Sequence, residues 1–74
     1  MKKNILIIDD SALMRRVLSD IINESSNYQV VYTATDGIAG LKILEEHNDI
    51  HVIFLDIHMP KMDGIEFLEV AKRK

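Results

Sequence analysis

The sequence predicts a three-layer α/β fold, in which a parallel sheet lies between helices. Three observations support this. Strand-like and helix-like segments alternate along all 74 residues in the order β-α-β-α-β-α. The first strand-like run, residues 5–8, is apolar at every position, and the third, residues 50–55, is apolar except at His51, which is typical of strands covered on both faces. The apolar residues of the segments between them recur every three or four positions, as they do on one side of a helix.

The first strand is expected at residues 5–8, an apolar run that ends at Asp9 and Asp10. Ser11 is suited to cap the following helix, because its side-chain oxygen can accept a backbone N–H of the first turn. The polar residues 24–27 end that helix. Its predicted core-facing side consists of Leu13, Met14, Val17, Leu18, Ile21 and Ile22.

Residues 28–34 form the second predicted strand, rich in β-branched and aromatic side chains. Asp36 and Gly37 then make a turn or a cap before a helix that ends near residues 47–49. The apolar side of that helix carries Ile38, Leu41, Ile43 and Leu44. Residues 50–55 form a third, buried strand, which ends at Asp56. The last predicted helix begins at Asp63, with Glu66 completing a capping box and Ile65, Leu68 and Val70 on its apolar side.

The composition excludes several classes of function. Nine basic against 12 acidic residues give a net charge of −3, which argues against a nucleic-acid-binding surface. The absence of cysteine excludes disulfides and thiolate metal sites, and fits a location in the reducing cytoplasm. The longest strictly apolar runs have four residues, so we expect neither a membrane span nor a signal peptide.

Three acidic residues follow two of the predicted strands. In open parallel sheets the ligand site lies beyond the carboxyl ends of the strands, which here selects Asp9, Asp10 and Asp56. If the first and third strands are neighbours, these carboxylates converge, and two such charges about 4 Å apart repel by roughly 4 kcal/mol at an effective dielectric near 20. A bound cation would offset that repulsion. Because every donor is an oxygen, the expected ion is Mg²⁺ or Mn²⁺.

Asp56 is the candidate for chemistry at this site. A carboxylate beside a divalent ion can act as a nucleophile and accept a phosphoryl group as an aspartyl phosphate. Asp56 is preferred because it ends a buried strand. The simpler interpretation is that Asp9, Asp10 and Asp56 are ordinary strand ends and caps. Any one of them alone would carry little weight, whereas all three after adjacent strands favour an ion site.

Two stretches resemble the receiver domain of bacterial two-component response regulators. They are residues 5–11, ILIIDDS, and residues 54–64, FLDIHMPKMDG. The acidic pair after the first strand and the pattern D-x-x-M-P-x-x-D-G after the third carry the resemblance. Residues 11–18, SALMRRVL, are most similar to the receiver of a chemotaxis methylesterase, followed by chemotaxis single-domain receivers. The resemblance implies a flavodoxin-like receiver fold with strand order 2-1-3-4-5. Residues 1–74 would form its first three strands and three helices.

The resemblance also implies roles for individual residues. Asp56 would accept a phosphoryl group from the phosphohistidine of a sensor histidine kinase. Asp10 would bind Mg²⁺ directly, Asp9 would hold it largely through water, and the backbone carbonyl of His58 would be the remaining protein ligand. The His58 side chain would either tune dephosphorylation or be an ordinary solvated loop histidine. The loop after Asp56 would be shaped by Met59, Pro60 and Gly64.

Two other functions compete with a phosphoacceptor. The family's Ser/Thr after strand 4 and Lys after strand 5 have no counterpart here, so the chain could be a truncated half-domain that is not phosphorylated. It would then act in protein interaction or assembly and self-associate through the exposed edge of residues 50–55. A carboxylate-dependent phosphatase usually has a second Asp two positions after its nucleophile, where this chain has His58. We expect no enzyme activity, because a methylesterase domain of any parent protein would lie outside this chain.

Overall fold

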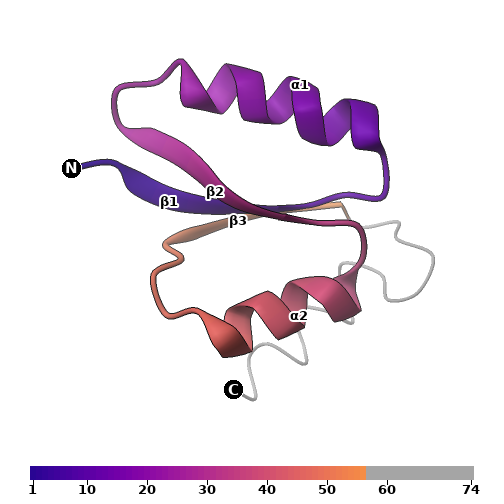
Figure 1. Ribbon diagram of the computed structural model, residues 1–74. Helices are drawn as coiled ribbons and strands as arrows, with labels where there is room; N and C mark the ends of the chain where they lie inside the picture. The colour runs from indigo at the N-terminus through magenta and orange to yellow at the C-terminus, as the bar shows by residue number, and fades with distance from the viewer. Residues whose placement is uncertain (57–74) are drawn as a thin grey trace.

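The computed structural model describes residues 1–56, and these form a three-layer α/β arrangement. The elements are β1 (Lys3–Ile8), α1 (Ala12–Asn23), β2 (Tyr28–Ala34), α2 (Gly37–Glu46) and β3 (Val52–Leu55). The strands are parallel and lie in the order β2-β1-β3. Figure 1 shows α1 on one face of the sheet and α2 on the other. The predicted fold class and the order 2-1-3 are therefore confirmed. The helix predicted to begin at Asp63 lies outside the described residues.

The central strand β1 supplies most of the core. Its last four side chains, Ile5 to Ile8, are at most 2% exposed. They alternate between the two faces, as strand geometry requires. Leu6 and Ile8 pack with residues of α2, whereas Ile5 and Ile7 pack with Leu18 and Ile22 of α1. The prediction that this strand is covered on both faces is confirmed.

The pairing of β1 with β2 contains one irregularity. Ile5 lies opposite Val30, but the next residue, Leu6, lies opposite Tyr32, so Val31 is an extra residue in β2. Such an insertion changes which face the following side chains occupy. Val30 accordingly packs on the α1 face and Tyr32 on the α2 face.

Both predicted helix caps are present. The Ser11 side chain accepts the backbone N–H of Met14 at 3.2 Å, and an Asp36 carboxylate oxygen accepts that of Ala39 at 2.8 Å. Each bond satisfies one of the N–H groups that the first turn of a helix leaves without a backbone partner. Neither helix of the described part has the length and apolar character needed to cross a membrane.

The apolar side of α1 is only partly used. Leu18 and Ile22 pack against the sheet, as predicted. The prediction that the other four residues face the core is wrong, because they are 40–72% exposed: Leu13, Met14, Val17 and Ile21. A helix lying on a sheet contacts it along a narrow strip, and this apolar stripe is wider than that strip. Ile38 of α2 is likewise 56% exposed.

The third strand is shorter and less buried than predicted. Its pairing with β1 begins at Val52, opposite Ile5, so residues 50 and 51 precede the strand. Ile50 packs instead against the cluster on the α2 face. Phe54 is 41% exposed, so the prediction of a buried strand is wrong at this position. Within residues 1–56, β3 pairs with β1 alone, and its other edge has no described neighbour.

Candidate metal centre

The three predicted acidic residues lie where two neighbouring strands end. Asp9 and Asp10 follow β1, and Asp56 follows β3. The sheet's hydrogen bonds continue one residue past each strand: the Asp9 N–H donates to the Ala34 carbonyl at 3.1 Å, and the Asp56 N–H donates to the Ile8 carbonyl at 2.9 Å. The backbone at Asp9 and Asp56 is therefore fixed by the sheet itself.

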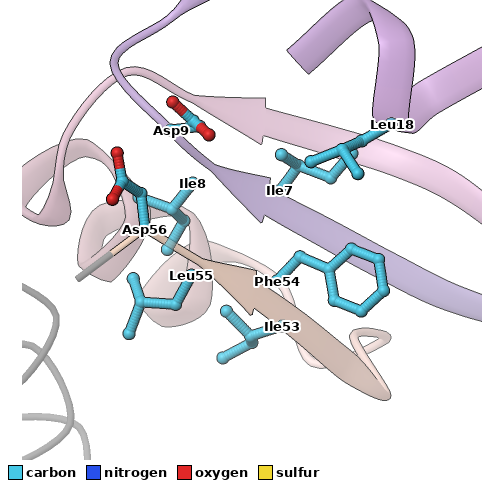
Figure 2. A pocket seen from close by; sticks show the side chains of 8 residues that line it. All are labelled: Ile7, Ile8, Asp9, Leu18, Ile53, Phe54, Leu55 and Asp56. Atoms are coloured by element: carbon cyan, nitrogen blue, oxygen red, sulfur yellow. The ribbon is translucent and has the colours of Figure 1, made fainter. Parts of the chain in front are cut away.

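The carboxylates converge as the sequence predicts. One oxygen from each of Asp9, Asp10 and Asp56 lies within 4.8 Å of the other two. Asp9 and Asp56 are half-buried and Asp10 is exposed. Figure 2 shows Asp9 and Asp56 next to each other at the ends of β1 and β3. Among residues 1–56, no other group of three or more His, Asp or Glu side chains is arranged to share an ion.

The arrangement fits a small divalent cation. Magnesium binds oxygen ligands at about 2.1 Å, which places opposite ligands about 4.2 Å apart. The observed spread of 4.8 Å is slightly wider and requires only a small side-chain adjustment. Exposure of Asp10 leaves space for the waters that Mg²⁺ retains. The donors are all oxygens, so the site suits Mg²⁺ or Mn²⁺ and not a metal that prefers sulfur.

A pocket adjoins the carboxylates. Asp9 and Asp56 form its polar part, and the rest is lined by Ile7, Ile8, Leu18, Ile53, Phe54 and Leu55 (Figure 2). These side chains place an uncharged surface beside the two carboxylates. The site therefore combines dense negative charge with a partly apolar wall.

The turn between β1 and α1 is anchored at Asp9. Its Oδ1 accepts the Ser11 N–H at 2.9 Å, and its carbonyl oxygen accepts Nη1 of Arg15 at 2.7 Å. Arg15 is not among the site residues predicted above. Arg15 and Arg16 are adjacent on a helix with the same charge, so no pattern in the sequence distinguishes the arginine that turns back toward the strand.

Four predicted site residues lie outside the described part of the chain, and their roles remain predictions: His58, Met59, Pro60 and Gly64. His47 and His51 are exposed. Both nevertheless have partners that the sequence does not reveal. The His51 Nδ1 accepts the Asn4 N–H at 2.9 Å, and the His47 ring stacks on Tyr32 with centroids 4.3 Å apart.

Tyr32 also lies close to an acidic side chain. Its hydroxyl is 3.1 Å from Nδ1 of His47 and donates to Oδ1 of Asp49 at 3.3 Å. Desolvation, followed by the charge and hydrogen bond of the Asp49 carboxylate, raises the pKa of Tyr32. These contacts lie near the start of β3 and use none of the three clustered aspartates.

Known proteins are similar to this chain in sequence and in fold. The response regulator receiver domain family matches residues 5–74. The protein-glutamate methylesterase/protein-glutamine glutaminase of Thiobacillus denitrificans is 48% identical over 73 residues, which are 99% of this chain and 20% of that protein. The response regulator domain of Thermotoga maritima CheB is 39% identical, with a TM-score of 0.92 over 100% of this chain and 55% of that one.

A third similar structure is the CheX-CheY-BeF3-Mg+2 complex from Borrelia burgdorferi. It has a TM-score of 0.84 and 35% identity, over 96% of this chain and 53% of the matched chain. The chain thus spans about a fifth of the length of the methylesterase and about half of each solved structure named here.

Proposed function

Because the chain belongs to the response regulator receiver domain family, we propose that it acts in a chemotaxis-type two-component pathway by accepting a phosphoryl group on Asp56. The observation that carries this proposal is the convergence of three carboxylates within 4.8 Å at the ends of β1 and β3. The donor would be the phosphohistidine of a sensor histidine kinase, and the reaction would take place in the cytoplasm. The receiver is not itself the catalytic part of the methylesterase relatives, so no esterase activity is proposed for this chain.

The proposed cofactor is Mg²⁺, with Mn²⁺ as a substitute. Asp10 would bind it directly, Asp9 largely through water, and Asp56 and the His58 backbone carbonyl would be the other protein ligands. The bound ion would offset negative charge on the phosphoryl oxygens. The CheY complex from Borrelia burgdorferi contains Mg²⁺ together with BeF3, which supports this choice of ion.

In the transfer step, a carboxylate oxygen of Asp56 forms a bond to phosphorus. The bond from phosphorus to the imidazole nitrogen of the donor breaks, and the imidazole keeps that electron pair and takes a proton from water. The Asp56 backbone is held by its hydrogen bond to Ile8, so the nucleophile belongs to the rigid sheet. We further propose that Met59, Pro60 and Gly64 shape the loop after Asp56 and that the His58 side chain tunes dephosphorylation.

Phosphorylation of two polypeptides by acetyl phosphate and Mg²⁺ tests this function. One is the 74-residue chain, and the other is the same chain joined to the remaining part of the Thermotoga maritima CheB receiver. Mass spectrometry should place one phosphoryl group on Asp56 of the chimera. The 74 residues alone should react about 10²–10³-fold more slowly, the usual effect of losing one group that stabilises developing charge.

The control is the chimera with Asp56→Asn, which should remain unlabelled. A chimera that folds but carries no label on Asp56 would contradict the proposed function. Rapid labelling of the 74 residues alone would instead remove the alternative of a half-domain that is not phosphorylated.

One observation favours a second role, in assembly. Within the described residues β3 has a single strand neighbour, and exposed apolar side chains of α1 and β3 lie on the same side of the sheet. We propose that the 74-residue polypeptide on its own self-associates through this edge. Sedimentation at micromolar concentration should show a dimer or larger species, and Phe54→Lys should shift it toward monomer. A cooperatively folding monomer of the unsubstituted chain would contradict this role.

A further inference from the structure

We propose that Arg15 is a positioning residue for the metal centre, acting through the backbone of Asp9. The inference rests on the proposed function, because it concerns the same Mg²⁺ site. Arg15 belongs to α1 and donates from Nη1 to the Asp9 carbonyl oxygen at 2.7 Å. It is not a metal ligand in this proposal: its bond reaches the peptide group that joins Asp9 to Asp10.

The bond completes the anchoring of Asp9. The Asp9 N–H is bound to the Ala34 carbonyl, and its Oδ1 accepts the Ser11 N–H. Arg15 binds the carbonyl oxygen. Three groups of Asp9 are therefore hydrogen-bonded, each to a different segment: its N–H to β2, its Oδ1 to the turn and its carbonyl oxygen to α1. The peptide plane between Asp9 and Asp10 is then held from the strand side and from the helix side.

Asp10 is the residue that depends on this plane. Its side chain is exposed, so packing does little to orient it. Its direction instead follows from the two anchored residues on either side, Asp9 and Ser11. Without the Arg15 bond, the plane between Asp9 and Asp10 could rotate, and binding an ion would have to order the Asp10 carboxylate first.

Arg15 itself is held in place. It is half-buried, its backbone N–H donates to the Ser11 carbonyl at 3.0 Å, and its carbonyl accepts the Ser19 hydroxyl at 2.6 Å. Arg16 provides the contrast. Its side chain is 83% exposed and pairs with Asp20 of the same helix at 4.0 Å. The two neighbours carry the same charge, but only Arg15 contacts the turn that holds the acidic residues.

Charge and positioning predict opposite effects of removing Arg15. A positive charge near a cation site repels the cation, so charge alone predicts that Arg15→Met binds Mg²⁺ more tightly. Positioning predicts weaker binding. Loss of a hydrogen bond that orients a metal ligand typically costs 10–100-fold in affinity, and for this partly exposed site we expect about tenfold. The sign of the change therefore separates the two explanations.

The test measures Mg²⁺ affinity by calorimetry for the unsubstituted chain, Arg15→Met, Arg15→Lys and the control Arg16→Met. The proposal predicts weaker binding for both Arg15 variants and no loss for Arg16→Met. In the metal-free protein, the NMR signal of the Asp10 amide, which shares its peptide group with the Asp9 carbonyl, should shift in Arg15→Met and stay in place in Arg16→Met. Arg15→Lys keeps the charge and the aliphatic stem, so it reports on the bond if Arg15→Met fails to fold.

Equal or tighter Mg²⁺ binding by both Arg15 variants would overturn the inference. An unsubstituted chain that binds no Mg²⁺ at millimolar concentration would contradict the metal centre instead. In that case the NMR signal of the Asp10 amide decides. An unchanged signal in Arg15→Met would overturn the positioning role, and a shifted signal would show that Arg15 orients the turn between β1 and α1.

Discussion

The two ends of the sheet use their polar groups in opposite ways. Near the start of β3, donors meet acceptors: Asn4 donates from its backbone to His51 and from its side chain to the Asp49 carbonyl, and it accepts from Gln29. These bonds join β1, β2 and the segment before β3. At the other end, three carboxylates lie within 4.8 Å of one another. The first end stabilises the fold, whereas the second places like charges together and is suited to a cation.

The largest effect is expected where donors and acceptors are matched. Asn4→Ala removes two side-chain hydrogen bonds, each worth about 1 kcal/mol. We expect the free energy of unfolding to fall by about 2 kcal/mol, measured by urea denaturation. The exposed Asn48 offers a control, because Asn48→Ala should change it by less than about 0.5 kcal/mol. If Asn4→Ala and Asn48→Ala lowered the free energy of unfolding equally, the hydrogen bonds of Asn4 would not stabilise this end of the sheet.

At the acidic end, a ligand should provide the stabilisation. At a concentration ten times its dissociation constant, Mg²⁺ should raise the free energy of unfolding by ~1.4 kcal/mol, because it binds the folded chain and not the unfolded chain. Asp10→Ala should abolish this increase, measured by thermal or urea denaturation with and without the ion. An increase that survives Asp10→Ala would show that Mg²⁺ acts elsewhere.

Without metal, a neutral substitution in the acidic cluster should raise the free energy of unfolding, whereas Asn4→Ala lowers it. Asp10→Asn removes one of the three clustered charges while keeping the size of the side chain. Because Asp10 is exposed, the relief is screened, and we expect an increase in unfolding free energy of about 1 kcal/mol. Denaturation in the presence of a chelator measures it. A loss of stability comparable to that of Asn4→Ala would mean that the cluster is structural.

The smallest effect concerns pH. The pKa of Tyr32 is raised by desolvation and by Asp49, so the folded state favours the protonated phenol. This contribution to stability is fully present below the unfolded pKa, near 10, and is lost as pH rises through the higher folded pKa. Asp49→Asn should shift the Tyr32 titration back toward its ordinary range, as followed by the ultraviolet absorbance of the phenolate. An unchanged titration would show that the carboxylate has no part in the shift.

The sequence predicted the parts of the molecule that follow from local chemistry and topology. The second strand was predicted with the observed bounds, the caps at Ser11 and Asp36 were correct, and Asp9, Asp10 and Asp56 converge because parallel neighbouring strands end at the same edge. The outer apolar residues of α1 could not be assigned, since helical periodicity defines a stripe but not how much of it the sheet covers. The His47 stack on Tyr32 depends on where two segments meet in space, which periodicity does not contain.

The extra residue Val31 explains why Tyr32 can reach His47 at all. In an uninterrupted strand, side chains two positions apart point to the same side, so Val30 and Tyr32 would both face α1. Because Val31 has no partner in β1, the side chain of Tyr32 faces α2 instead and lies beside the His47 ring on which it stacks. If Val31 were instead paired with β1, the even alternation would be restored, and the tyrosine hydroxyl would lie on the opposite side of the sheet from Asp49. A single residue without a partner in β1 thus decides which helix β2 presents its aromatic ring to.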